Sequence, residues 1–252
     1  MQTLSLQRGV IYGPVDSRRL GRSLGINLLP TSYKLCAFDC IYCQYGRTKV
    51  LTAKAEEESF PTVEVVLHEV EEALRQVPDL NYVTFSGNGE PTLHPHFDEM
   101  VKGVISLRDK LRPEVKTAIL SNSALVGEEE VREALAKPDL RIMKLDAGDP
   151  LTWRAINRPV PSLDFETVIA GLRELEGVTI QSLILDGPVQ NVRGKAFDRW
   201  VETLASIAAQ EVQIYTTDRP VAEAKVEKVP KAILLEVARE AEARTGIPVR
   251  AY

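Results

Sequence analysis

The chain has 252 residues, a formal net charge of −5, and 44% hydrophobic and 27% charged residues. This length and apolar fraction allow one domain with a sizeable core, and the acidic balance argues against indiscriminate binding to nucleic acid. No apolar run approaches the roughly 20 residues that span a bilayer, and the first ten residues lack the pattern of a signal peptide. We therefore expect a cytoplasmic protein with no membrane partner.

Apolar segments of strand length alternate along the chain with segments of helical periodicity. The expected strands are residues 23–29, 81–85, 115–120, 140–145, 178–185 and 212–216. The first expected helix begins near residue 61. The others cover residues 96–111, 128–136, 165–175, 197–208 and 232–243. Regular alternation of this kind indicates parallel β-α units with right-handed crossovers.

The segments outside these elements suggest how the chain is organised. Residues 13–17 form a turn-rich run, and residues 186–194 and 218–229 are the longest irregular stretches, which we expect to be loops over a site. The expected organisation is a single domain over residues 1–252. It comprises a basic N-terminal segment (1–22), a barrel core (23–216), and a C-terminal loop and helix (217–252).

Positive charge is concentrated near the N-terminus, where residues 1–54 carry eight Lys and Arg against two Asp. Two explanations remain open for the set as a whole, and a plain solvated face is a third for Arg47, Lys49 and Lys54. These cations balance a negatively charged group bound by the chain, or they attract an anionic substrate such as a nucleic acid or a phosphorylated molecule. The basic residues are Arg8, Arg18, Arg19, Arg22, Lys34, Arg47, Lys49 and Lys54.

All three cysteines, Cys36, Cys40 and Cys43, lie within one short C-x3-C-x2-C stretch. Thiolates suit iron–sulfur clusters or zinc, and three of them can hold three irons of a cubane and leave the fourth open. A structural zinc site needs a fourth ligand, and the three histidines are far away in sequence. A redox pair lacks a thioredoxin-like context, and an odd cysteine count disfavours a disulfide framework. The pattern therefore favours a cluster.

Polar and glycine residues follow three of the expected strands. Gly87 and Gly89 would let the backbone approach a ligand, and Glu90 adds a carboxylate. Ser121 and Asn122 could contact a ligand or form a turn. Lys144 and Asp146 share one face of their strand because side chains alternate. A structural ion pair and a substrate contact are both open for them.

The cysteine spacing, with the aromatic Tyr42 before the last cysteine, resembles the signature of the radical S-adenosylmethionine (SAM) superfamily. The resemblance implies an α/β fold, a partial (β/α)6 barrel whose mouth holds a [4Fe-4S] cluster and SAM. It implies that the three cysteines bind the cluster and leave its fourth iron to SAM. The residues expected to bind SAM are Tyr42, Gly87, Asn88, Gly89, Glu90, Ser121, Asn122 and Asp146, with Glu90 in a G-G-E-like motif on the methionine amino group.

Residues 145–147, 156–159 and 165–166 resemble the wyosine-synthetase branch of that superfamily, whose members remodel a tRNA guanine. This chain differs from that branch because it has no cysteines for a second cluster. The resemblance implies reductive cleavage of SAM to a 5′-deoxyadenosyl radical that abstracts hydrogen from an unidentified substrate, with a tRNA base as one candidate. A flavodoxin or ferredoxin would supply the electron. The alternatives are a glycyl-radical-enzyme activase and a non-catalytic module that binds a cluster or nucleic acid.

Overall fold

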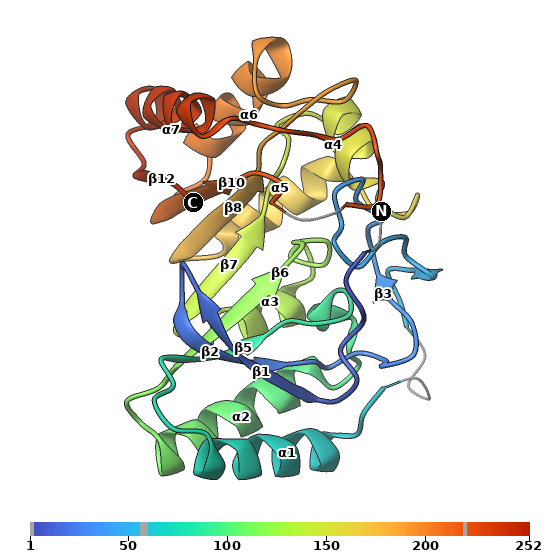
Figure 1. Cartoon of the computed structure of the whole chain (residues 1–252), viewed down its shortest axis with the longest axis vertical. Helices are drawn as coiled ribbons and strands as arrows, with labels where there is room; N and C mark the ends of the chain where they lie inside the picture. Colours follow the sequence, from blue (N-terminus) through green and yellow to red (C-terminus); the bar gives the residue numbers. More distant parts are fainter. Residues whose placement is uncertain (1–2, 56–59, 219–220) are drawn as a thin grey trace.

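The computed structural model describes residues 3–55, 60–218 and 221–252, which form one curved eight-stranded sheet with helices packed along it (Figure 1). Each of the six expected strands is present in this sheet, together with two that were not expected. The order is β1 (Ile11–Ser17), β2 (Gly21–Ile26), β5 (Tyr82–Phe85), β6 (Lys116–Ser121), β7 (Leu140–Lys144), β8 (Val178–Leu183), β10 (Glu211–Tyr215) and β12 (Val249–Ala251).

All neighbouring pairs from β2 to β12 are parallel, as the alternating pattern predicted. The sheet does not close, because β1 and β12 end it and do not pair with each other. The predicted α/β class and partial barrel are therefore confirmed. Every residue of β8 is buried, as expected for a strand with helices on one face and a packed interior on the other.

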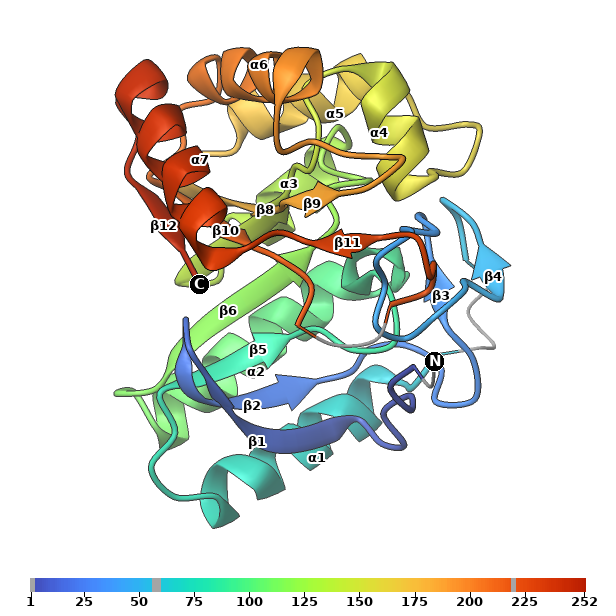
Figure 2. The same ribbon diagram turned by 45° about the horizontal axis from the view of Figure 1, so that its top comes forward.

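The predicted helices are also present, and they cover the sheet from outside (Figure 2). α1 and α2 lie beside the β2–β6 end, whereas α6 and α7 lie beside β8, β10 and β12. α1 faces the core through the buried residues Val66, Val70 and Leu74. The helices are α1 (Val63–Gln76), α2 (Phe97–Leu111), α3 (Glu129–Leu135), α4 (Pro150–Asn157), α5 (Phe165–Glu174), α6 (Gly194–Ala205) and α7 (Lys231–Thr245).

The turn predicted over residues 13–17 is wrong, because these residues belong to β1. β1 pairs antiparallel with β2, and the register shifts between Tyr12 and Val15, next to Pro14. An edge strand tolerates a proline because the missing N–H costs no ladder bond on its open side. The N-terminal segment is therefore part of the barrel sheet.

Two small sheets complete the fold. β3 (Leu35–Cys36) pairs with β4 (Val50–Leu51), and β9 (Leu185–Asp186) pairs with β11 (Glu227–Lys228). The second pair joins the two loops expected over a site, although residues 219–220 lie outside the described residues. A short 3-10 helix, η2 (Pro91–Leu93), follows β5. Among the described helices, none combines the length and hydrophobicity needed to cross a bilayer.

Candidate functional site

The cysteine loop is held against the turn that follows β5 by main-chain contacts. Leu35 in β3 forms a parallel bridge with Gly89. The Leu35 amide donates to the Asn88 carbonyl, and the Glu90 amide donates to the Leu35 carbonyl, each at 3.2 Å. The loop beginning at Cys36 and the β5 turn therefore form one connected unit.

The two glycines of this turn are required by that close approach. A Cβ at Gly89 would lie 1.6 Å from the Leu35 carbonyl oxygen, and one at Gly87 would lie 2.3 Å from the Asn27 side-chain oxygen. Gly87 also has φ +143°, a conformation that L side chains rarely adopt. The glycines were expected to let a ligand approach the backbone. They also let the cysteine loop and the end of the first parallel strand, β2, pack closely against this turn.

Two asparagine side chains donate hydrogen bonds to cysteine sulfurs. Asn122 Nδ2 lies 3.4 Å from Cys36 Sγ, and Asn157 Nδ2 lies 3.5 Å from Cys40 Sγ. All three cysteines are free thiols. Burial raises the pKa of Cys36 to about 12 and that of Cys40 to about 11. A bound cationic centre is the agent that would hold such thiols as thiolates.

Lys34 places a buried positive charge beside the cysteines. Its side chain donates to the Gly46 carbonyl at 3.0 Å, and the residue is 5% exposed. Burial by itself lowers the pKa of Lys34, but the neighbouring Cys43 and Cys36 thiols raise it above its ordinary value. One member of the basic N-terminal set therefore lies where it can balance a negatively charged cluster.

The thiol set fits a cluster on chemical grounds. Within the described ranges, no three or more His, Cys, Asp or Glu side chains lie close enough together to bind one metal ion. A cubane does not need such a group because each thiolate binds its own iron. Hydrogen bonds to the sulfurs and a nearby cation are features that tune iron–sulfur centres.

Glu90 is buried, and four donors of this chain surround its carboxylate. Thr92 donates from its amide (3.2 Å) and its hydroxyl (2.7 Å), Ser121 from its hydroxyl (2.8 Å), and Asn122 from its amide (2.6 Å). Burial raises the pKa of Glu90 above its ordinary value, although these donors oppose the shift. Glu90 therefore fixes the position of Asn122, which in turn contacts Cys36.

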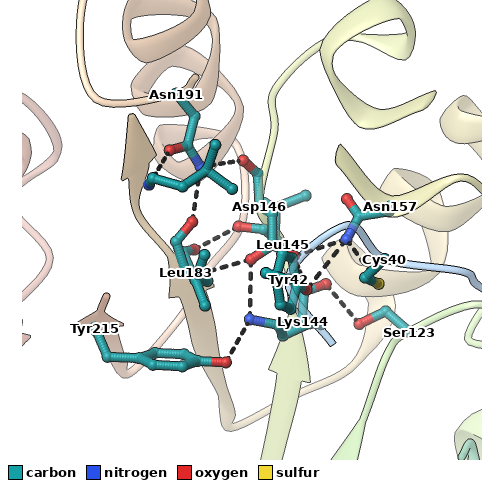
Figure 3. A network of polar contacts seen from close by, with 12 residues as sticks. Cys40, Tyr42, Ser123, Lys144, Leu145, Asp146, Asn157, Leu183, Asn191 and Tyr215 are labelled. Carbon is teal, nitrogen blue, oxygen red and sulfur yellow. Dashed lines mark hydrogen bonds and ion pairs between the residues drawn. The ribbon is translucent and has the colours of Figure 1, made fainter. Parts of the chain in front are cut away.

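Asp146, just after β7, is the centre of a second polar network (Figure 3). One carboxylate oxygen accepts from the Tyr42 hydroxyl and from Asn157 Nδ2 (2.7 Å). The other accepts from the Leu183 amide (2.7 Å) and lies 3.0 Å from Lys144 Nζ. The network joins the cysteine loop, α4, β7 and β8.

Lys144 forms the structural ion pair that was one of its two predicted roles. Besides Asp146, its ammonium group donates to the Tyr215 hydroxyl at 2.9 Å and lies 4.9 Å and 4.6 Å from the ring centres of Tyr42 and Tyr215. Burial lowers the pKa of Lys144, whereas the Asp146 charge raises it, and the net change is upward. Lys144 therefore helps to hold Tyr42 beside the cysteines.

A cavity of about 340 Å³ opens beside the cysteine loop. Residues from the cysteine loop, the β5 turn, the β1–β2 hairpin and the late strands line it together, which gives it the size of a small-ligand site. A larger groove of about 620 Å³ runs along α7 and β12, away from the cysteines. The cavity residues are Tyr12, Arg19, Tyr42, Cys43, Gln44, Tyr45, Ser86, Gly87, Gly89, Leu120, Gln181, Leu183, Tyr215, Thr217 and Val221.

A family model described as the radical SAM superfamily matches residues 31–193, which include the cysteine loop and both polar networks. The chain belongs to the radical SAM superfamily. Membership confirms the predicted family of enzymes and implies an iron–sulfur cluster and SAM as cofactors. Cys36, Cys40 and Cys43 are the residues whose chemistry fits that cluster.

Several curated relatives are similar in sequence to this radical SAM chain. UPF0026 proteins of Methanocaldococcus jannaschii and Synechocystis sp. are 33% identical over 228 residues and 32% identical over 216 residues. These matches cover 88% and 83% of this chain, and 67% and 76% of the relatives. A protein named GTPase Obg from Brachyspira hyodysenteriae is 34% identical over 168 residues, which are 67% of this chain but only 23% of that protein.

Solved radical SAM structures share the fold. A radical SAM methyltransferase from Sphaerobacter thermophilus aligns with a TM-score of 0.68 and 16% identity, over 91% of this chain and 65% of that one. TYW1 with a lysine-pyruvate adduct bound aligns with a TM-score of 0.63 and 18% identity, over 88% of this chain and 73% of that one. At these identities the likeness shows the fold alone.

The structure brings most of the predicted radical SAM site residues together, and the Asn88 side chain among them also has partners in the N-terminal part of the chain. Its side chain is fully buried and donates to the carbonyls of Gln7 (2.9 Å) and Pro30 (3.0 Å). Its side-chain oxygen accepts from the Gln7 amide at 2.8 Å. The side chain thus anchors the N-terminal segment to the β5 turn.

Some basic residues of the N-terminal set have local partners that the sequence pattern did not predict. Arg47 pairs with Asp39 at 2.8 Å and with Glu223, and Arg18 pairs with Asp218 at 3.2 Å. Because these charges are balanced within the chain, the excess near the N-terminus is a weaker sign of an anionic partner than it first suggested.

The sequence prediction missed Asn157 as a site residue. It ends α4, a helix whose start has a clear signal: the Asp149 side chain caps the Leu151 and Thr152 amides, and Pro150 occupies the first turn. The residue after the helix, Arg158, has φ +46°, and this reversal places Asn157 beside the cysteine loop. A capped eight-residue helix ending in Asn-Arg-Pro was the available signal.

Proposed function

We propose that this chain is a radical SAM enzyme with a single [4Fe-4S] cluster on Cys36, Cys40 and Cys43. When bound, the cluster and SAM supply the reductive cleavage that yields methionine and a 5′-deoxyadenosyl radical, which takes a hydrogen atom from the substrate. The observation that carries the proposal is the set of three free thiols on one loop, of which Cys36 and Cys40 accept N–H···S bonds and Cys43 lines a cavity of about 340 Å³.

The residues around this loop have separable tasks. Lys34 offsets negative charge at the thiolates, while Asn122 and Asn157 orient the sulfurs. The Glu90 carboxylate accepts a hydrogen bond from the Asn122 amide, and the Asp146 carboxylate accepts hydrogen bonds from Asn157 and Tyr42. These contacts preorganise the loop before any cofactor is bound.

Anaerobic reconstitution tests the proposal. We expect about four irons per chain, a paramagnetic spectrum of the reduced protein that changes when SAM is added, and slow formation of 5′-deoxyadenosine with a strong reductant. Replacing each cysteine singly by serine should abolish the cluster because the chain has only three cysteines. Stoichiometric zinc with no obtainable cluster would refute the assignment, as would full iron loading of a triple serine variant.

The substrate and the electron donor are further parts of the proposal. A tRNA base is supported by the resemblance of residues 145–147 and 156–159 to the wyosine-synthetase branch, and a flavodoxin or ferredoxin is the natural one-electron donor. Labelled tRNA titrated at two salt concentrations tests the first point, because phosphate contacts make binding strongly salt-dependent. Absence of RNA binding at low salt would exclude tRNA and favour another substrate class, such as the protein backbone that a glycyl-radical activase uses.

A further inference from the structure

The β1–β2 hairpin places an arginine inside the barrel. Leu20, at the hairpin turn, packs against Ala118 and Ile142 on the inward face of the sheet. The neighbouring Arg19 lines the cavity beside the cysteine loop, and its guanidinium carbon lies 5.2 Å from the ring centre of Tyr215 at the end of β10. A residue from the N-terminal edge of the sheet thus reaches the same cavity as Cys43.

Arg19 has no acidic partner among the residues that the structure describes. Its Nη1 atom is buried and donates no hydrogen bond to any of those residues, although the adjacent Arg18 is paired with Asp218 at 3.2 Å. Among the described residues that line the cavity there is no Asp or Glu. Burial lowers the pKa of Arg19 from its ordinary value, because no carboxylate offsets the loss of hydration. Arg19 is half-buried, and a guanidinium partly withdrawn from water with no counter-charge is costly unless something else pairs with it.

Gln181, on β8, supplies a second unused donor to the same cavity. The residue is 7% exposed, and its Nε2 atom has no hydrogen-bond partner in the described part of the chain. Buried polar groups are nearly always hydrogen-bonded, so an orphaned donor calls for a ligand or an ordered water. Lys144, the other nearby cation, is already paired with Asp146 and Tyr215. Arg19 and Gln181 both line this cavity, and each has a donor with no acceptor among the described residues.

We propose that this end of the cavity binds an oxyanion, a carboxylate or a phosphate, of the substrate, with Arg19 as the charged donor and Gln181 as the neutral one. The inference rests on the proposed radical SAM function in one respect. That function is the reason to assign the oxyanion to the substrate, the molecule that loses a hydrogen atom. A guanidinium matches the two oxygens of such a group in a fork geometry. A cavity of about 340 Å³ suits a small molecule or a single side group.

The test measures oxyanion binding by calorimetry, with inorganic phosphate and acetate as probes at constant ionic strength. Both the apoprotein and the SAM-loaded holoenzyme are titrated. We expect one site per chain in each form. Arg19→Gln should weaken binding by roughly 10- to 100-fold, the effect of losing one charge-assisted hydrogen bond. Arg19→Lys should give a smaller loss because it keeps the charge but not the fork.

Arg18→Gln is the matched control, since it removes the same charge from the adjacent position but outside the cavity. We expect its probe affinity to stay within about twofold of the wild type. Gln181→Leu removes the second donor without touching the hairpin, so it keeps the test valid if Arg19→Gln does not fold. Equal losses of probe affinity in the Arg18 and Arg19 variants would overturn the proposal. Such losses would show that the probes respond to the overall positive charge and not to a specific site.

A second arm separates the substrate from SAM itself, whose carboxylate has the same chemistry. If SAM and phosphate bind together, and Arg19→Lys leaves SAM affinity unchanged, the anion belongs to the substrate. If SAM displaces phosphate and the Arg19 variants lose SAM affinity, the substrate assignment is overturned. Because the apoprotein is titrated too, oxyanion binding without a reconstitutable cluster would refute the proposed function and leave this site standing.

Discussion

Replacing Asp146 by Asn should strongly destabilise the fold. The Asp146 side chain is 0% exposed, and its partner Lys144 is 12% exposed. An amide of the same shape removes the charge opposite Lys144. It also turns one acceptor oxygen into a donor that faces either the Tyr42 hydroxyl and Asn157 or the Leu183 amide. Breaking a buried ion pair on one side costs about 3–5 kcal/mol.

The assay is urea unfolding of the apoprotein under reducing conditions. With a slope of roughly 3 kcal/mol per molar urea, the expected loss lowers the midpoint by about 1–1.7 M. The matched control is Asp186→Asn, which removes a carboxylate paired with Arg193, a residue that is 66% exposed. Surface pairs contribute about 0–1 kcal/mol, so this control should change the midpoint little.

A double-mutant cycle with Lys144→Met tests whether the ion pair is the cause. If it is, the double variant should be less destabilised than the sum of the two single changes, with a coupling of roughly 1.5 kcal/mol or more. Additive losses, or a loss below about 1 kcal/mol for Asp146→Asn, would show that Asp146 does not hold this network together.

Three further predictions concern the loop and its supports. Glu90→Gln should weaken SAM binding by roughly 10- to 100-fold while iron content is kept, and iron loss with intact SAM affinity would contradict this. Asn157→Ala should lower the cluster reduction potential, measured by redox titration, by about 40 mV, the equivalent of one hydrogen bond of about 1 kcal/mol. Unchanged potentials in this variant and in Asn122→Ala would exclude tuning of the cluster by the two side-chain amides. Glu223→Gln should speed trypsin cleavage within residues 217–229 because it removes the ion pairs that dock this loop, and cleavage as slow as in the control Glu227→Gln would show that they do not.

The fold could be predicted from the sequence where a single local pattern determines an element. Buried parallel strands such as residues 178–183 combine apolar residues with small or uncharged polar ones over a strand-length segment, and the helices between them have strong periodicity. β1 was missed because Gly13 and Pro14 are turn formers, and only the antiparallel pairing with β2 makes the segment a strand. α4 was missed because eight residues give little periodicity.

The cysteines could be predicted from spacing, but the contacts around them could not. The Tyr42–Asp146 hydrogen bond joins residues 104 positions apart, and only the assembled barrel brings them together. A motif position also does not reveal side-chain direction. The contacts of the Asn88 side chain with Gln7 and Pro30 could therefore not be predicted. Arg19 was noted for its charge alone, because its orphaned position depends on where the hairpin turn lies.

The main-chain contact between Leu35 and Gly89 has a consequence for how this site can vary. The segment that carries the thiols and the turn that follows β5 are joined by two amide–carbonyl bonds, so their separation does not depend on any side chain. Substitutions in the walls of the cavity can therefore change what the enzyme accepts without changing this spacing. A side chain at Gly89 would instead collide with the Leu35 carbonyl and displace both segments at once. Side chains of the cavity walls would thus determine which substrate is accepted, whereas main-chain atoms would determine the spacing around the cofactor.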